Sequence, residues 1–188
     1  MGGRERLRSG FAAALLLVAA VPVLREPASI ALIERYARVG GPYHDVAVSD
    51  ADADAYWAGA GKRRLPAGVS QVRMRLEPGA IVARARVDFQ RLAPGAGRDP
   101  LLALFSGTHR ITVRAQLDSG RAPRAKLTVT EVRLDGSEIP TVLVDTAIAV
   151  LIQPRHPGFS RMFSVALPRH ALSVAARAGN VLFRYPRG

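Results

Sequence analysis

Three acidic residues in alternation are the first candidates for chemistry in this sequence. Asp50, Asp52 and Asp54 have the opening spacing of a calcium-binding loop. Such a loop needs glycine at its sixth position and glutamate at its twelfth, and the sequence has Ala55 and Gly61 there. We therefore expect these carboxylates to mark the first turn of a helix.

A second candidate is the dipeptide Gly61-Lys62, which ends the phosphate-binding loop of many nucleotide-binding proteins. The earlier glycine of that motif falls at Tyr56, and Arg63 stands where serine or threonine is required. The motif therefore predicts no nucleotide site.

Other catalytic and metal-binding patterns are not found either. The histidines are scattered without metal-ligand spacing, and the sequence has no Gly-x-Ser-x-Gly element. The absence of cysteine excludes disulfides, thiolate metal sites and a cysteine nucleophile. We predict no catalytic residue, no metal site and no cofactor, and a hydrolase assembled from distant residues is the least favoured alternative. The four histidines are His44, His109, His156 and His170.

The strongest chemical signal is positive charge. Lysine and arginine number 27 against 15 acidic residues, a formal charge of +12, and only two of the 27 are lysine. Either the codon bias of a GC-rich genome or selection for anion binding explains this preference for arginine. Guanidinium groups match the geometry of phosphate oxygens.

Alternating strands must position these arginines. Apolar and charged residues alternate from Val72 to Leu76 and again from Ile81 to Phe89, with Pro78-Gly79 as a two-residue turn. In that register Leu76 faces Ile81, Met74 faces Ala83 and Arg73 faces Arg84. A shift by one residue would bury arginines, so the register is well determined.

This hairpin places several arginines on one sheet face, and a third alternating run from Ile111 to Leu117 extends it. The face is either a solvated outer surface or a surface for anionic groups such as lipid phosphates or envelope polymers. We regard nucleic acid as the less probable anion for an exported protein. The predicted anion-binding residues are Arg73, Arg75, Arg84, Arg86 and Arg114.

Further strands follow. A fourth run begins at Ala125, and its alternation changes parity near Thr130 or Glu131, which predicts a β-bulge before Asp135-Gly136 ends the strand. A second hairpin is expected from Val174 through the turn at Ala178-Gly179-Asn180 to the strand Val181–Tyr185. The dipeptides Leu65-Pro66 and Leu167-Pro168 precede the two hairpins at similar distances, a weak internal repeat.

Helices should flank this sheet. The pattern predicts helices at 29–39 and 49–57, the second capped by Ser49, and a turn or two at 100–105. A longer one is expected at 141–152, where nearly the whole circumference is apolar, so that it should be enclosed. The β-branched residues there leave a central strand as the alternative.

The inward-facing apolar residues are candidates for contact with an amphipathic ligand. They come from the predicted strands and from the apolar helix, and they could equally form only a packed core. They are Met74, Ile81, Val87, Phe89, Ile111, Val113, Val144 and Ile148.

The N-terminal segment predicts export. Arg4, Arg6 and Arg8 precede fourteen apolar residues, Phe11–Leu24, a run too short to span a bilayer comfortably and typical of a signal peptide. We assign residues 1–31 to a signal peptide or, alternatively, a retained N-terminal anchor, and residues 32–188 to a single domain. The predicted location is the periplasm or cell envelope.

Four segments together resemble small exported bacterial proteins, and these are similar to the phospholipid-binding family linked to mannan elongation in the actinobacterial envelope. The segments are Val48–Ala53, Leu65–Gly79, Asp99–Leu104 and the unit at Leu167-Pro168. The predicted strands and helices together indicate an α+β fold, a curved antiparallel sheet of four to six strands in hairpins wrapped on one or two helices. The resemblance implies a curved sheet wrapped on a long helix, related in shape to tubular lipid-binding domains. It carries over no catalytic residue. The chain departs from it in the short, proline-interrupted stretch Gln153–Gly158.

These observations predict an exported, non-enzymatic protein of the cell envelope that binds a phospholipid or another amphipathic ligand and could meet an anionic membrane surface. The alternative is a structural or assembly component of the envelope, in which the same apolar faces form a filled core.

Overall fold

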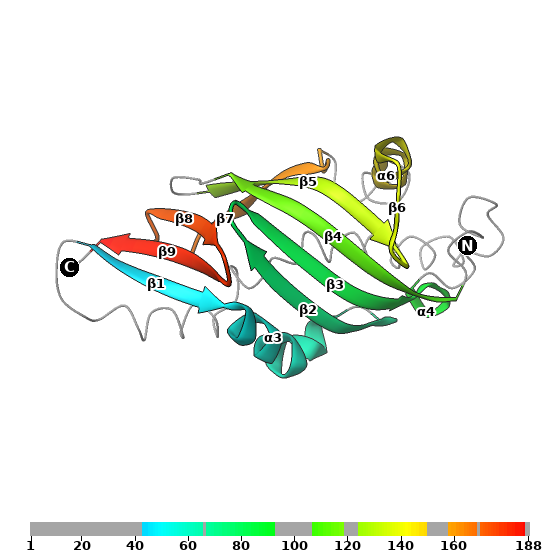
Figure 1. Ribbon diagram of the computed structural model, residues 1–188, viewed down its shortest axis with the longest axis horizontal. Helices are drawn as coiled ribbons and strands as arrows, with labels where there is room; N and C mark the ends of the chain where they lie inside the picture. Colours follow the sequence, from blue (N-terminus) through cyan, green and yellow to red (C-terminus); the bar gives the residue numbers. More distant parts are fainter. Residues whose placement is uncertain are drawn as a thin grey trace, which may run out of the picture.

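The strands of this protein form two antiparallel sheets (Figure 1). The computed structural model describes residues 43–65, 67–92, 107–118, 124–149, 158–168 and 170–186. The larger sheet has the order β2 (Val69–Glu77), β3 (Ala80–Asp88), β4 (Thr108–Asp118), β5 (Arg124–Leu134) and β6 (Ser137–Glu138), and β7 (Met162–Ala166) also pairs with β5. The smaller sheet has the order β1 (Tyr43–Ser49), β9 (Asn180–Pro186) and β8 (Ser173–Arg177).

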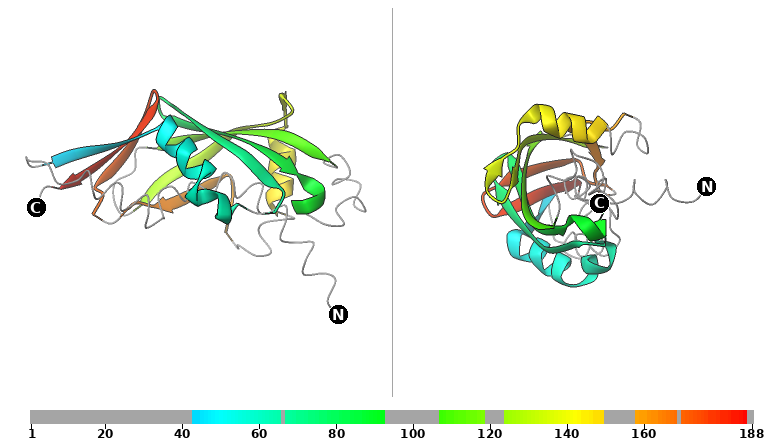
Figure 2. Two further views of the ribbon diagram at one scale, coloured as in Figure 1. Left: turned by 90° about the horizontal axis from the view of Figure 1, so that it is seen from below. Right: turned by 90° about the vertical axis from the view of Figure 1, so that its right-hand side faces the viewer.

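Short helices lie at the edges of the larger sheet. The helix α3 (Asp50–Ala58), continued by the 3-10 helix η2 (Ala60–Arg64), packs beside β2, and α6 (Thr141–Ala147) packs near β5. A short helix α4 (Phe89–Leu92) follows β3. The right-hand view of Figure 2 shows the sheet curling into an open arc with α3 and α6 at opposite edges. The predicted α+β fold with a curved antiparallel sheet is confirmed.

The first predicted hairpin has the expected register. Leu76 pairs with Ile81, Met74 with Ala83 and Arg73 with Arg84. The turn is Pro78-Gly79, and Gly79 has a φ of +68°, which glycine adopts without a steric penalty. Alternation fixed this register because a slipped pairing would have buried guanidinium groups.

The predicted bulge in the fourth strand is also present. Arg114 pairs with Glu131 while its neighbour Ala115 pairs with Val129, so Thr130 is the extra residue. The strand ends at Asp135-Gly136, where both residues have positive φ, the geometry of a two-residue turn that suits a twisted hairpin.

The C-terminal hairpin joins the two sheets through its turn. Gly79 in the first turn donates its N–H to the carbonyl of Ala176 at 3.1 Å, and Gly179 in the second turn donates to the carbonyl of Leu76 at 2.8 Å. Figure 1 shows the two turns meeting between the sheets. The weak repeat in the sequence thus ends in two turns that bond to each other reciprocally.

The acidic row begins a helix, as predicted. Ser49 caps α3 by accepting the N–H of Asp52, whose carboxylate in turn accepts the N–H of Ser49 at 2.9 Å. Asp50 and Asp54, one helical turn apart, accept the backbone N–H groups of Leu76 and Met74 in β2 at 2.7 and 2.8 Å. The helix therefore satisfies donors along an edge strand that would otherwise be open to pairing.

The predicted segment 141–152 does begin as a helix and not as a strand, but the prediction that this helix is enclosed is wrong. The helix covers Thr141–Ala147, with one wider turn at Ile148 and Ala149, and of its described side chains only Val144 and Ile148 are buried. Val142 is 72% exposed, because α6 lies at a sheet edge and presents a single stripe to the core. Apolar side chains are often exposed on protein surfaces, so the apolar circumference of this helix was not enough to predict that it is buried. Residues 150–152 lie outside the described residues.

Several predictions fall on segments that the structure does not describe. They are the signal peptide or anchor at 1–31, the helix at 29–39, the turns at 100–105 and the proline-interrupted stretch at 153–157. Three strands, β1, β6 and β7, were not predicted from the sequence. The two-residue β6 pairs with β5 just after the turn, whereas β1 and β7 are held by partners farther along the chain, β9 for β1 and β5 for β7.

Candidate functional site: a convex arginine face and its cleft

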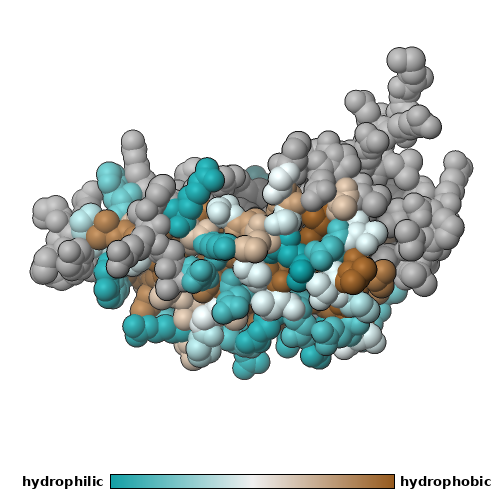
Figure 3. All heavy atoms as spheres, turned by 90° about the horizontal axis from the view of Figure 1, so that it is seen from above, coloured by the Kyte–Doolittle hydropathy of each residue, from teal (hydrophilic) through white to brown (hydrophobic). Residues whose placement is uncertain are grey.

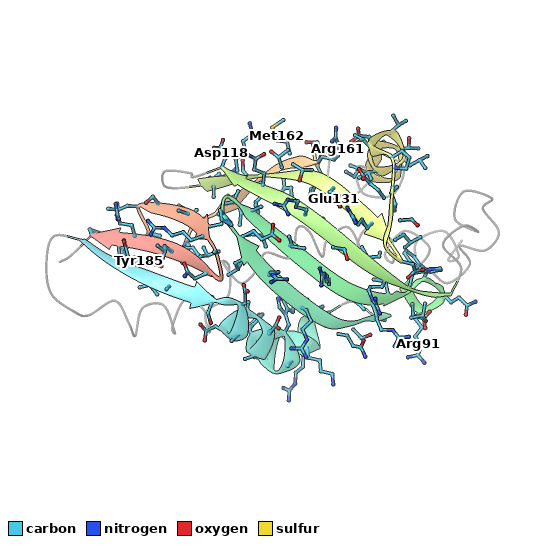
Figure 4. All side chains as sticks on the ribbon, in the orientation of Figure 1. Arg91, Asp118, Glu131, Arg161, Met162 and Tyr185 are labelled. Carbon is cyan, nitrogen blue, oxygen red and sulfur yellow. The ribbon has the colours of Figure 1, made fainter. Side chains whose placement is uncertain are left out.

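The convex side of the larger sheet carries its arginines in rows across the strands. Arg73 of β2 pairs with Arg84 of β3, and Arg86 of β3 pairs with Arg110 of β4. Neighbouring strands lie about 4.8 Å apart, so these guanidinium groups stand side by side. Figure 4, which views this side, shows many nitrogen-tipped side chains over β2, β3 and β4. All five predicted anion-binding arginines belong to this surface, and with Arg110 they form the arginine face: Arg73, Arg75, Arg84, Arg86, Arg110 and Arg114.

Carboxylates neutralise only part of the arginine face. Arg73 lies 3.1 Å from Asp54, and Arg114 pairs with Glu77. Among the described residues, no carboxylate lies within ion-pair distance of the other four members, which are Arg75, Arg84, Arg86 and Arg110. Like charges facing each other across strands are destabilising. A bound anion would offset that repulsion.

A cleft of about 600 Å³, here named cleft 1, opens where the arginine face meets α3 and η2. Among the described residues, its lining contains five cationic side chains and no carboxylate. Trp57, Leu65, Val69 and Val72 give it an apolar part, and Ser70 adds a hydroxyl beside Arg86, its partner in the strand pairing. The lining therefore suits a ligand with an anionic head and an adjoining carbon chain. The five cations are Lys62, Arg73, Arg84, Arg86 and Arg110.

The wall formed by η2 depends on Gly61. A Cβ at this position would lie 2.5 Å from Cε1 of Tyr56 and 2.9 Å from Cε3 of Trp57, closer than side-chain atoms approach one another. Because Gly61 has no side chain, its backbone packs against both rings. The next residue, Lys62, then lines cleft 1. The same packing buries part of Tyr56 and raises the pKa of its hydroxyl above the ordinary value.

A β-bulge in β2 forms the opposite wall. Ser70 pairs with Arg86 and Arg73 with Arg84, so Gln71 and Val72 both oppose Ala85. Gln71 has a φ of +51°, a left-handed conformation that costs a residue other than glycine on the order of 1–2 kcal/mol. Bulges redirect side chains and are common beside functional sites. Here the bulged residues themselves line cleft 1.

A second depression of about 480 Å³, here named cleft 2, adjoins cleft 1 and shares Arg84 and Arg110 with it. Unlike cleft 1 it contains carboxylates, those of Glu77, Glu131 and Asp135. Figure 4 shows Glu131 on β5. Glu77 and Glu131 are engaged in ion pairs with arginines, so cleft 2 offers an added anion less uncompensated charge.

Asp135 is held in its ionised form at the rim of cleft 2. It accepts the backbone N–H of Arg110 at 2.7 Å, and its other oxygen lies 2.6 Å from Nδ1 of His109. These two hydrogen bonds, the first being the larger cause, lower the pKa of Asp135 below its ordinary value. His109 lines neither cleft, and among the described residues no group of three metal-ligating side chains is found.

The predicted apolar ligand contacts belong to the hydrophobic core. Seven are buried there and Ile111 is packed against it, and none of the eight lines cleft 1 or cleft 2. That these residues contact a ligand stays a prediction. They are Met74, Ile81, Val87, Phe89, Ile111, Val113, Val144 and Ile148.

Sequence reasoning missed two cations and the bulge of cleft 1. Lys62 belongs to the dipeptide rejected as a nucleotide motif, yet it does line the cleft. Arg110 precedes the predicted third strand by one residue, and extending the alternation back from Thr112 would have found it. The irregular spacing of Val69, Val72 and Met74 signals the bulge.

Comparison with protein-family models, curated proteins and solved structures found no match. In the part of the chain that the structure describes, no helix has both the length and the hydropathy needed to cross a bilayer.

Proposed function

We propose that this protein is a non-enzymatic lipid-binding protein of the cell envelope and that the arginine face binds anionic lipid headgroups. The observation that carries this proposal is excess positive charge: among the described residues, four neighbouring arginines have no carboxylate within ion-pair distance, and the described ionisable side chains that line cleft 1 are all cationic. Guanidinium forks bind phosphate oxygens in pairs. The envelope location rests on the signal-like segment Phe11–Leu24.

Apolar groups at one edge of the sheet give this proposal secondary support. Val142 and Leu143 on α6 and Met162 on β7 are 72%, 47% and 49% exposed. Figure 3, which views the molecule from this edge, shows hydrophobic residues reaching the surface among hydrophilic ones. Exposed apolar side chains suit the boundary between headgroups and acyl chains, and here they lie at the sheet edge opposite α3 and cleft 1.

Vesicle co-sedimentation tests the proposal. The protein should bind phosphatidylcholine vesicles that contain phosphatidylglycerol and not vesicles of phosphatidylcholine alone, and binding should weaken as salt is added. Each basic residue near an anionic surface contributes about 1 kcal/mol, so Arg75→Gln should lower vesicle affinity about fivefold. Arg177→Gln removes the same charge from an exposed position of β8 and should change affinity much less. Equal affinity for neutral and anionic vesicles would contradict the proposal.

A structural or assembly role in the envelope is the second candidate. The observation that favours it is the burial of the apolar set in one core cluster. In that role the arginine face is a solvated surface, and the protein would bind neither vesicles nor extracted lipid.

A further inference from the structure

We infer that cleft 1 is a specific site for a phosphate monoester, the terminal dianionic phosphate of a lipid headgroup or of a small soluble ester. This deepens the proposed function, on which it rests for the lipid as the source of the phosphate. The rest of the arginine face supplies general attraction to anions. Cleft 1 adds shape and a defined set of donors.

The first argument is the charge inside cleft 1. In the part of the chain that the structure describes, five cations and no carboxylate line a space of about 600 Å³. A monoester phosphate carries close to two negative charges above its second pKa of about 6, whereas a diester carries one. A site with several uncompensated cations gains more from the dianion. Cleft 2 shares two of these arginines but contains three carboxylates, and so lacks this preference.

The second argument is the placement of the donors. Ser70, Arg86 and Arg110 stand in one row across β2, β3 and β4, and Arg73 and Arg84 stand in the next. A terminal phosphate exposes three oxygens, and hydrogen-bond donors from two adjacent rows can reach different oxygens of the same group. Lys62 adds a fifth cation from η2, an element outside the sheet.

The third argument is that the walls are specifically built. The Gln71 bulge holds a strained backbone conformation, and Gly61 approaches two rings so closely that an added Cβ would force Tyr56 or Trp57 to shift. Strained residues persist where the surrounding structure determines them, often at ligand sites. Trp57, Leu65 and Val69 leave an apolar side for the carbon skeleton attached to the phosphate.

Calorimetric titration of the purified protein tests the inference, with glycerol 3-phosphate as the monoester and diethyl phosphate as the diester. We expect the monoester to bind at least about tenfold more tightly, and its affinity to rise between pH 5 and pH 7 as the second proton leaves the ligand. Dihexanoyl phosphatidic acid, kept below its micelle concentration, tests the lipid source. Tighter binding of this lipid than of glycerol 3-phosphate assigns the phosphate to a lipid, and equal binding assigns it to soluble esters.

Variants separate cleft 1 from the general face. Arg86 lines cleft 1 but not cleft 2, and Arg75 lines neither. Arg86→Gln should lower monoester affinity about tenfold or more, and Arg86→Lys less, because lysine keeps the charge but loses the fork. Arg75→Gln should weaken vesicle binding while leaving monoester affinity within about twofold, since it lies outside the cleft. Thermal unfolding of each variant shows whether it is folded, and Arg110→Gln replaces Arg86→Gln if the latter is not.

The outcomes distinguish the two proposals. Equal affinity for monoester and diester, or equal losses in Arg86→Gln and Arg75→Gln, would overturn the cleft site even if vesicle binding stands. Specific monoester binding with no affinity for anionic vesicles would support the cleft and overturn the membrane-surface proposal.

Discussion

Replacing Asp54 with alanine should destabilise the fold by about 2–3 kcal/mol. Asp54 is only 24% exposed, and one of its oxygens accepts the Met74 N–H at 2.8 Å. A hydrogen bond to a charged group is worth about 1.5–3 kcal/mol. The other oxygen pairs with Arg73, which is 68% exposed, so that solvent screening limits this ion pair to less than about 1 kcal/mol. The hydrogen bond is therefore the larger part of the loss.

Urea denaturation followed by circular dichroism measures this effect as a shift of the midpoint at constant slope. Asp54→Asn keeps a carbonyl acceptor for the Met74 N–H and should cost about half as much as Asp54→Ala. Asp118→Ala is the matched control, because Asp118 is exposed near the end of β4 and should change stability by less than about 0.5 kcal/mol.

One result would refute the reasoning. If Asp54→Ala unfolds at the same urea concentration as the control, then water satisfies the N–H of Met74 and α3 does not seal the edge of β2. The sealing of this edge also bears on cleft 1, because the same helix carries Trp57 into its lining.

Three further predictions concern the turn, the cap and the helix α6. Gly179→Ala should lower the free energy of unfolding by about 1–2 kcal/mol in the same assay, because φ is +76° at this position. The added Cβ would meet nothing within 4 Å, so the whole cost is backbone strain. An unchanged urea midpoint would contradict this prediction. Ser49→Ala should cost about 1 kcal/mol at neutral pH. The Ser49 hydroxyl and N–H lower the pKa of Asp52, so the part of this cost that comes from the hydroxyl–carboxylate bond should be lost as the pH falls from about 4 through that lowered pKa. The part that comes from the capped Asp52 N–H should remain, and a cost independent of pH in unfolding curves would count against the capping box. Val144→Ala should cost about 2 kcal/mol and Val142→Ala less than about 0.5, and equal costs would show that α6 is enclosed after all.

Much of the larger sheet could be predicted from local pattern. The alternation of Met74, Leu76 and Ile81 with arginines determines both the register and the exposed face, because any shift would bury charge. The parity change near Thr130 located a bulge for the same reason. These features depend on neighbours within one hairpin, and such information lies in a few consecutive residues.

The remaining features depend on contacts between distant segments. β1 exists because β9 pairs with it, across more than half of the chain. The burial of Val142 could not be judged without knowing that α6 lies at an edge. Cleft 1 needs η2, packed on two aromatic rings through Gly61, to stand opposite the bulge at Gln71. Each part leaves a trace in the sequence, but only the fold brings the parts together.

Because of the reciprocal hydrogen bonds between the two hairpins, we expect the two sheets to separate in one cooperative opening step. Each hairpin supplies a donor from its turn and an acceptor from the strand before that turn, so separating the sheets breaks both bonds in a single opening event. The amide protons of Gly79 and Gly179 should therefore exchange with solvent at matched opening free energies, although they lie in different sheets. A force or a ligand that breaks the bond of one hairpin turn should therefore also break the bond of the other, although the two glycines are 100 residues apart in the sequence.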